Sequence, residues 1–146
     1  MTIILEIRFK IIEGKRYIFD AFRQKFVRAT PEEVVRQHFC RFLVNERQFP
    51  IISIANECGM TLNGRQLRCD TLIAKHAVPI AIVEYKAPEV EITQQVFEQV
   101  ARYNMVYGVP YFFISNGRQT YACRYDASTQ RWSYLTDIPT WEAMQP

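Results

Sequence analysis

The sequence predicts an α+β fold whose elements follow the order αβββαβ, with further strands at both ends of the chain. Residues 2–12 alternate apolar and charged side chains, which is the period of a strand. The run Thr-Pro-Glu-Glu at 30–33 is typical of a helix start. Residues 65–86 form two runs rich in β-branched and apolar side chains, separated by turn residues, which predicts a pair of strands.

The composition indicates a single folded domain. With 146 residues, 49% of them hydrophobic and 14% aromatic, the chain can bury its own core. We expect one domain over 1–146: an N-terminal β hairpin and connector at 1–29, a core at 30–125 and an extension at 126–146. No apolar run approaches the roughly 20 residues that span a bilayer, so we expect no membrane contact.

Four cysteines are scattered along the chain without a C-x-x-C pair: Cys40, Cys58, Cys69 and Cys123. This pattern favours buried free thiols in a cytoplasmic protein over a zinc site. The net charge of +3 is compatible with nucleic-acid contact without arguing strongly for it.

The N-terminal strand is expected to turn at Glu13-Gly14-Lys15 and return over 16–19 as a hairpin. A basic, aromatic connector at 22–28 leads to the first helix, which runs from Pro31 to about Glu46. Thr30 is suited to cap this helix, and Glu33 completes a capping box.

A three-strand meander, a second helix and further strands follow. The strands of the meander are predicted at about 51–62, 65–74 and 79–86, with Asn63-Gly64 as a type I′ turn signal. The second helix is predicted at 91–107, and later strands at 111–114, 119–125 and 132–135.

The second and third strands of the meander bring charged residues together. If Ala77 is the centre of their turn, Asp70 lies opposite Glu84, about 5 Å away between Cβ atoms. Lys86 projects from the same side as Glu84, because side chains alternate along a strand. Two such carboxylates repel one another, and a divalent metal with oxygen ligands, such as Mg²⁺, satisfies their need for a cation. The alternative is a solvated ion-pair cluster in which Lys86 neutralises both acids.

Five short motifs carry a family resemblance: TPEEVVRQ at 30–37, RCD at 68–70, VEYKAP at 83–88, Gln99-x-x-x-Tyr103-Asn104 and SNG at 115–117. Together with the order of elements, they resemble the N-terminal nuclease domain of type I restriction enzyme R subunits, within the PD-(D/E)xK nuclease fold. The resemblance covers about residues 20–125 and is strongest to small proteins that carry this domain alone.

The resemblance implies a restriction-endonuclease-like fold, with a central mixed sheet flanked by helices, and a DNA endonuclease activity related to restriction–modification. It implies a Mg²⁺ site, with Mn²⁺ as a substitute, formed by Asp70 and Glu84 with support from Glu33. The carbonyl of Tyr85 would be a further ligand, and Lys86 would be the catalytic lysine.

The Q-x-x-x-Y motif implies a nucleic-acid contact from the second helix. Gln99 and Tyr103 share one helix face, and Arg102 lies beside them. Cys69 replaces the proline of the family motif, at a position that varies within the fold. The alternative role for Gln99 and Tyr103 is structural, as a surface amide and a half-buried core ring.

The sequence contains no G-x-x-x-x-G-K-[ST] phosphate loop. The expected partner is DNA, and the chain is expected either to act alone or to work with a separate motor or restriction–modification subunit. Two other functions stay open at this point: a non-catalytic nucleic-acid-binding or partner-binding module that retains the fold, and a structural domain with surface ion pairs.

Overall fold

The computed structural model describes residues 4–145, except for the side chains of Tyr103 and Asn104. The elements in chain order are β1 (Phe9–Ile12), β2 (Lys15–Asp20), β3 (Lys25–Arg28), α1 (Pro31–Arg47), a 3₁₀ turn (Ile51–Ser53), β4 (Ile54–Leu62), β5 (Arg65–Lys75), β6 (Val78–Tyr85), α2 (Gln94–Met105), β7 (Tyr111–Ser115), β8 (Thr120–Asp126) and β9 (Arg131–Leu135). No helix within this part of the chain is long and apolar enough to cross a membrane.

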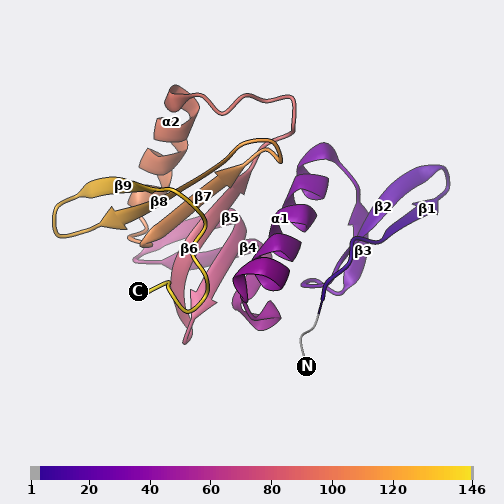
Figure 1. Cartoon of the computed structure of the whole chain (residues 1–146), viewed down its shortest axis with the longest axis horizontal. Coiled ribbons are helices and arrows are strands. Elements are labelled where there is room, and N and C mark those ends of the chain that lie inside the picture. Colours follow the sequence, from indigo (N-terminus) through magenta and orange to yellow (C-terminus); the bar gives the residue numbers. More distant parts are fainter. Residues whose placement is uncertain (1–3, 146) are drawn as a thin grey trace.

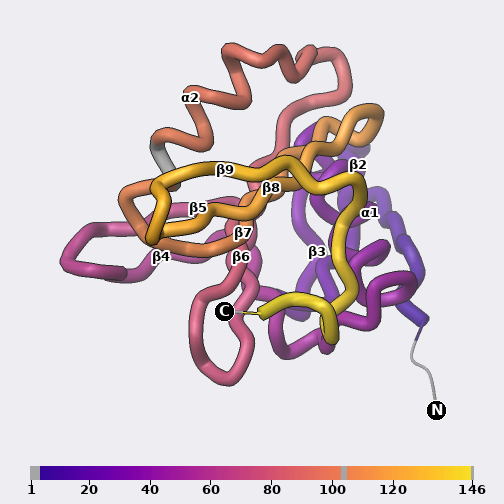
Figure 2. The backbone as a smooth tube through the Cα atoms, turned by 60° about the vertical axis from the view of Figure 1, so that its left-hand side comes forward, coloured from indigo at the N-terminus to yellow at the C-terminus, as the bar shows by residue number. Residues whose placement is uncertain are grey.

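The main sheet has six strands in the order β4-β5-β6-β7-β8-β9. All neighbours are antiparallel except β6 and β7, which are parallel and are joined through α2. Figures 1 and 2 show α1 and α2 on opposite faces of this sheet. The predicted α+β class, with a mixed sheet flanked by helices and extra strands at the N-terminus, is confirmed.

Helix α1 begins where the sequence predicts it. The Thr30 hydroxyl accepts a hydrogen bond from the Glu33 backbone N–H at 3.2 Å, and Pro31 occupies the first helical position. The helix ends at Gln48, which has a left-handed backbone with φ 59°. Its apolar stripe, including Phe39 and Leu43, packs on one face of the sheet.

The opposite face of the sheet is covered by α2. Phe97 and Ala101 of α2 pack against Ile82 of β6 and Phe112 of β7. Because both faces of the central strands are covered, β7 is buried along its whole length, as its continuous apolar run indicates.

The N-terminal region differs from the predicted hairpin and connector. Residues 25–28 form a third strand, β3, which pairs with β2 through contacts such as Phe19 opposite Phe26. The first strand begins only at Phe9, and residues 1–3 lie outside the described part of the chain. Alternation continues N-terminal to Phe9, but only the part that pairs with β2 is a strand.

A buried polar network joins this three-stranded sheet to the main sheet. The Asp20 carboxylate, fully buried, accepts hydrogen bonds from the Arg23 side chain and from the Asn56 amide at 3.1 Å. Asn56 accepts from the Thr71 hydroxyl at 2.6 Å, and the Tyr85 hydroxyl donates to Thr71 at 2.9 Å. Burial alone would raise the pKa of Asp20, but the hydrogen bonds from Arg23 and Asn56 hold it below its ordinary value.

Replacing Asp20 should therefore destabilise the whole domain. We expect Asp20→Ala to lower the free energy of unfolding by about 3 kcal/mol, because it leaves the partly buried Arg23 without one of its acidic partners. Urea denaturation at neutral pH measures this change. Glu46→Ala, at an exposed position on α1, is the control and should leave stability nearly unchanged; equal effects of the two substitutions would contradict the structural role of the network.

Candidate functional site

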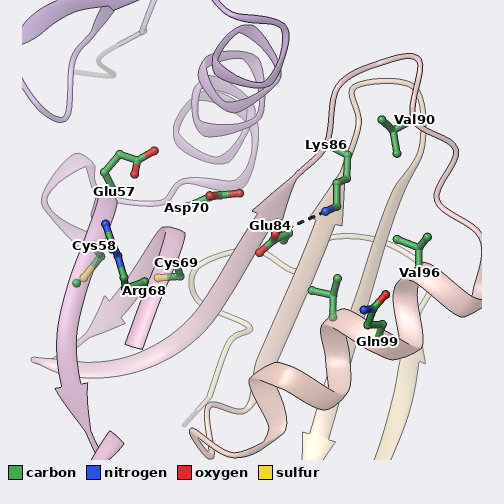
Figure 3. Close-up of a pocket in the computed structure, with 12 residues that line it drawn as sticks. Glu57, Cys58, Arg68, Cys69, Asp70, Glu84, Lys86, Val90, Val96 and Gln99 are labelled. Atoms are coloured by element: carbon green, nitrogen blue, oxygen red, sulfur yellow. Dashed lines mark ion pairs between the residues drawn. The ribbon is translucent and has the colours of Figure 1, made fainter. Parts of the chain in front are cut away.

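The pairing of β5 with β6 places Asp70 beside Glu84. Thr71 pairs with Val83, so Asp70 and Glu84 are the next residues along their strands. The Asp70 carboxylate accepts a hydrogen bond from the Tyr85 backbone N–H at 2.9 Å, which holds it at the end of β6. The two carboxylates lie side by side in Figure 3.

The turn that precedes this pairing is not centred on Ala77, so that expectation is wrong. His76 and Ala77 form a two-residue turn, both left-handed with φ 53° and 64°, and Lys75 pairs with Val78. A register shift follows, because Ala74 pairs with Pro79 whereas Ile73 pairs with Ala81. Ile80 is therefore an extra, bulged residue without a partner on β5. Beyond the bulge the register is the predicted one, with Thr71 opposite Val83.

A third carboxylate approaches from β4. Glu57 lies opposite Asp70, between the pairs Asn56–Thr71 and Cys58–Cys69, and its backbone is left-handed with φ 56°. Asn56 bonds to Thr71 in the network beneath α1, whereas Cys58 packs with the core beneath α2. The alternation of side chains along β4 is therefore interrupted at Glu57. As a result Glu57 and Cys58, although consecutive, both lie on the cavity side of the sheet.

These carboxylates line a cavity of about 680 Å³ between the sheet and α2. Figure 3 shows the cavity with Lys86 extending over it beside Glu84. The lining residues are Glu57, Cys58, Gly59, Arg68, Cys69, Asp70, Glu84, Lys86, Val90, Val96, Gln99 and Val100.

The electrostatics of the cavity favour a bound cation. Burial, together with the neighbouring Asp70, raises the pKa of Glu84 to about 7. Burial also raises the pKa of Asp70. The ammonium of Lys86 lies 3.9 Å from the Glu84 carboxylate, which is a loose ion pair. The site therefore holds two carboxylates whose negative charges are only partly compensated.

The cavity does not contain a reactive thiol. Burial raises the pKa of Cys69 to about 12 and also raises that of Cys58. Both thiols are therefore protonated at neutral pH and are poor nucleophiles. Any chemistry at this cavity would therefore depend on its oxygen donors and its cations.

Glu33 does not lie on the cavity. One of its carboxylate oxygens accepts from Arg23 at 2.7 Å. The other accepts from Gln37 at 3.0 Å and lies 3.3 Å from the Arg36 guanidinium. Because both oxygens are bound to these groups, the structure does not support the expectation that Glu33 contacts the metal directly.

Arg36 links Glu33 to the site instead. Its guanidinium is buried, forms an ion pair with Glu57 and donates to the Asp70 carbonyl at 3.0 Å. Arg36 of α1 therefore contacts two cavity residues, the backbone of Asp70 and the carboxylate of Glu57. Its spacing of three residues from Glu33 suggests an ion pair on the helix, but the sequence does not indicate its contacts with β4 and β5.

The α2 residues predicted to contact nucleic acid do not all line the cavity. Gln99 lines it, whereas Arg102 is exposed on the same helix and is not among the lining residues. The side chain of Tyr103 lies outside the described part of the structure. Its expected role in nucleic-acid contact stays a prediction.

Two charged lining residues, Arg68 and Glu57, were not anticipated as site residues. Arg68, exposed on β5, adds a cation near the carboxylates, and its position two residues before Asp70 could have suggested this. Glu57 had no comparable signal, because no sequence pattern indicates the left-handed backbone that brings it to the cavity.

Among the residues that the structure describes, no group of three or more His, Cys, Asp or Glu side chains is arranged to hold a metal ion. A metal at this site would therefore have Asp70 and Glu84 as its side-chain ligands, and its other ligands would be backbone oxygen, water or substrate. Mg²⁺ commonly binds in this manner, through one or two carboxylates and several further oxygens.

The fold is that of a known class of restriction enzyme domain. The structure is similar to a fragment of a chain assigned as an HsdR subunit of a type I restriction enzyme from Vibrio vulnificus YJ016, with a TM-score of 0.57 and 20% sequence identity. The match covers 79% of this chain but only 24% of that chain. No curated protein matches the sequence.

The sequence itself identifies the family. Residues 31–139 match the family described as type I restriction enzyme R protein N terminus (HSDR_N), and the chain belongs to that family. The resemblance noted from the motifs is thereby confirmed, and it links the domain to restriction–modification.

The raised pKa of Glu84 predicts a pH-dependent stability in the absence of metal. An unfolded glutamate releases its proton near 4.5, whereas folded Glu84 retains it until about pH 7. Folding stability should therefore fall as the pH rises through this window, by up to about 3 kcal/mol, and Glu84→Gln should lack this part of the dependence.

Urea denaturation of both proteins in EDTA, at pH 5 and pH 8, measures the difference. Glu46→Gln, an exposed position on α1, is the matched control and should follow the wild type. If wild type and Glu84→Gln lose or gain the same stability between the two pH values, Glu84 has an ordinary pKa.

Proposed function

We propose that this domain is a divalent-metal-dependent deoxyribonuclease that hydrolyses phosphodiester bonds. The observation that carries the proposal is the adjacency of Asp70, Glu84 and Lys86 in one cavity, where Lys86 makes a loose ion pair with Glu84 at 3.9 Å. Two carboxylates with a lysine beside them form a suitable ligand set for metal-assisted phosphodiester hydrolysis.

The donor set fits Mg²⁺, with Mn²⁺ as a substitute. Asp70 and Glu84 would hold the ion, with the Tyr85 carbonyl as a further oxygen ligand. When bound, such an ion would stabilise negative charge on a phosphate and lower the pKa of a coordinated water. In this proposal Glu33 acts indirectly, because it holds Arg36, which in turn contacts Glu57 and the Asp70 carbonyl.

Lys86 is the proposed catalytic lysine. Its ammonium extends over the cavity beside Glu84 (Figure 3). From there it can donate hydrogen bonds to an attacking water or to a phosphoryl oxygen. As a cation near the developing negative charge, it stabilises the transition state of the reaction more than the ground state.

The nucleic acid would be held at the mouth of the cavity. Gln99 on the cavity wall and Arg102 on the exposed side of α2 are the proposed contacts from the helix, with Tyr103 one turn from Gln99. Arg68 on β5 is a further candidate for a phosphate contact. If these groups contact mainly phosphates, we expect binding that tolerates many sequences, because phosphate contacts carry no sequence information.

The proposed partners are DNA and a separate motor or restriction–modification subunit. The chain spans about a quarter of the Vibrio vulnificus chain that it matches, and no phosphate-loop motif occurs in its sequence. Translocation along DNA would therefore depend on another polypeptide segment.

A pair of substitutions tests the proposal. Wild type should cleave plasmid, linear or single-stranded DNA in the presence of Mg²⁺ or Mn²⁺. Asp70→Asn should lose both cleavage and calorimetric Mn²⁺ binding, because it removes a charged ligand. Lys86→Ala should lose cleavage by at least about a hundredfold but bind Mn²⁺, because the lysine acts on water or phosphate.

Three outcomes bear on the proposal. Cleavage by Lys86→Ala at the wild-type rate would remove the lysine from the mechanism. Equal Mn²⁺ affinity of wild type and Asp70→Asn would remove the metal site. DNA binding without cleavage under any metal condition would favour the alternative, a non-catalytic nucleic-acid-binding module that retains the fold.

A further inference from the structure

The N-terminal sheet, β1–β3, carries a surface that the cavity does not explain. Its register places two rows of side chains across one face. The first row is Lys10, Tyr17 and Arg28. The second is Arg8, Phe19 and Phe26, since the Phe19 N–H donates to the Arg8 carbonyl and Phe19 pairs with Phe26. Lys15 lies on the same face, near the hairpin turn.

The cations of these rows are held over the aromatic rings. The Arg8 guanidinium lies 4.9 Å from the centre of the Phe19 ring, and the Lys10 ammonium lies 5.1 Å from that of Phe26. The Arg28 guanidinium lies 5.7 Å from the centre of the Tyr17 ring. Such contacts restrict the side chains while leaving their charged ends in solvent, so an anion can be bound with less loss of side-chain entropy.

The exposed cations of this sheet are more numerous on one face than on the other. The face with the two rows, which we call the basic face, carries four exposed cations: Lys10, Lys15 and Arg28 in the strands and Arg8 just before β1. The described strands β1–β3 place no carboxylate on this face. The acidic residues of the segment lie elsewhere: Glu6 precedes β1 and Glu13 is in the turn. The opposite face enters the core at Ile18 and holds Asp20, which is buried in the polar network. That face also carries two exposed cations, Arg16 and Lys25.

We propose that the basic face is a second nucleic-acid-binding surface, separate from the cavity, that contacts the phosphate backbone. A nucleic-acid backbone complements a carboxylate-free array of cations, and exposed cations interleaved with aromatic rings resemble surfaces that bind single strands. Figure 1 shows β1–β3 beyond α1, at the other end of the molecule from the β8–β9 hairpin. This inference goes beyond the proposed nuclease activity and does not require a metal.

Fluorescence anisotropy with labelled single-stranded and double-stranded DNA, in EDTA, tests the surface. Lys10→Gln with Arg28→Gln is compared with Arg65→Gln and Arg131→Gln, two exposed cations of the β4–β5 and β8–β9 hairpins. Both double variants lower the formal net charge from +3 to +1. We expect Lys10→Gln with Arg28→Gln to weaken binding by about tenfold and to reduce the slope of log Kd against log salt by about 2. The control, Arg65→Gln with Arg131→Gln, should weaken binding less than about threefold.

Thermal melts confirm that each variant is folded. Lys15→Glu, at the exposed end of the face, provides a second test and should also weaken binding. Equal losses in the two double variants would overturn the proposal, because net charge alone would then explain binding. Unchanged affinity of the first double variant and of Lys15→Glu would overturn it as well.

The test is independent of catalysis. If the domain fails to cleave DNA but the two double variants differ as expected, the surface stands and the nuclease proposal fails. If the domain cleaves DNA but the two double variants bind DNA equally, the nuclease proposal stands and the basic face is not a binding surface.

Discussion

The site depends on the register between β5 and β6. A shift of one residue in an antiparallel pair moves every side chain to the other face of the sheet. The two-residue turn at His76 and Ala77 alone would align Asp70 with Val83, leaving Glu84 on the opposite face from Asp70. The buried bulge at Ile80 corrects this by one residue, so that Thr71 pairs with Val83 and the two carboxylates meet. A single inserted residue therefore creates the constellation on which the proposed chemistry rests.

Helix α1 supports this constellation through buried charges. Arg36 contacts Glu33, Glu57 and the Asp70 carbonyl, while Arg23 joins Glu33 to Asp20. A buried charge is costly unless it is paired, so these groups stabilise one another only in their native arrangement. The N-terminal sheet, the first helix and the cavity are thus coupled through a single network. Glu33 contributes to the site through this network rather than by contact with it.

Local sequence patterns were sufficient to predict most of the helices, strands and turns. The details of the cavity depend on tertiary contacts, which such patterns do not indicate. The Thr30 N-cap and the Asn63-Gly64 turn each depend on neighbours along the chain, and both lie where they were expected. The predicted capping box is only half formed, because the Glu33 carboxylate bonds to Arg23 and Gln37 instead of closing it. The pairing of Asp70 with Glu84 was also anticipated, although from an incorrect turn whose error the bulge cancels. The left-handed backbone at Glu57 could not be anticipated, because it accompanies tertiary features, the change of face in β4 and a salt bridge to Arg36, that no local sequence pattern indicates.

The central claim is that Asp70 and Glu84 together form a metal site. The most direct measurement is a crystal structure of the protein soaked with Mn²⁺, with the ion located by its anomalous scattering. The account predicts an anomalous peak within direct coordination distance of both carboxylates, on the side that faces Lys86, and no such peak in Asp70→Asn. A well-ordered crystal with no peak at this position, or with its peak at other residues, would contradict it.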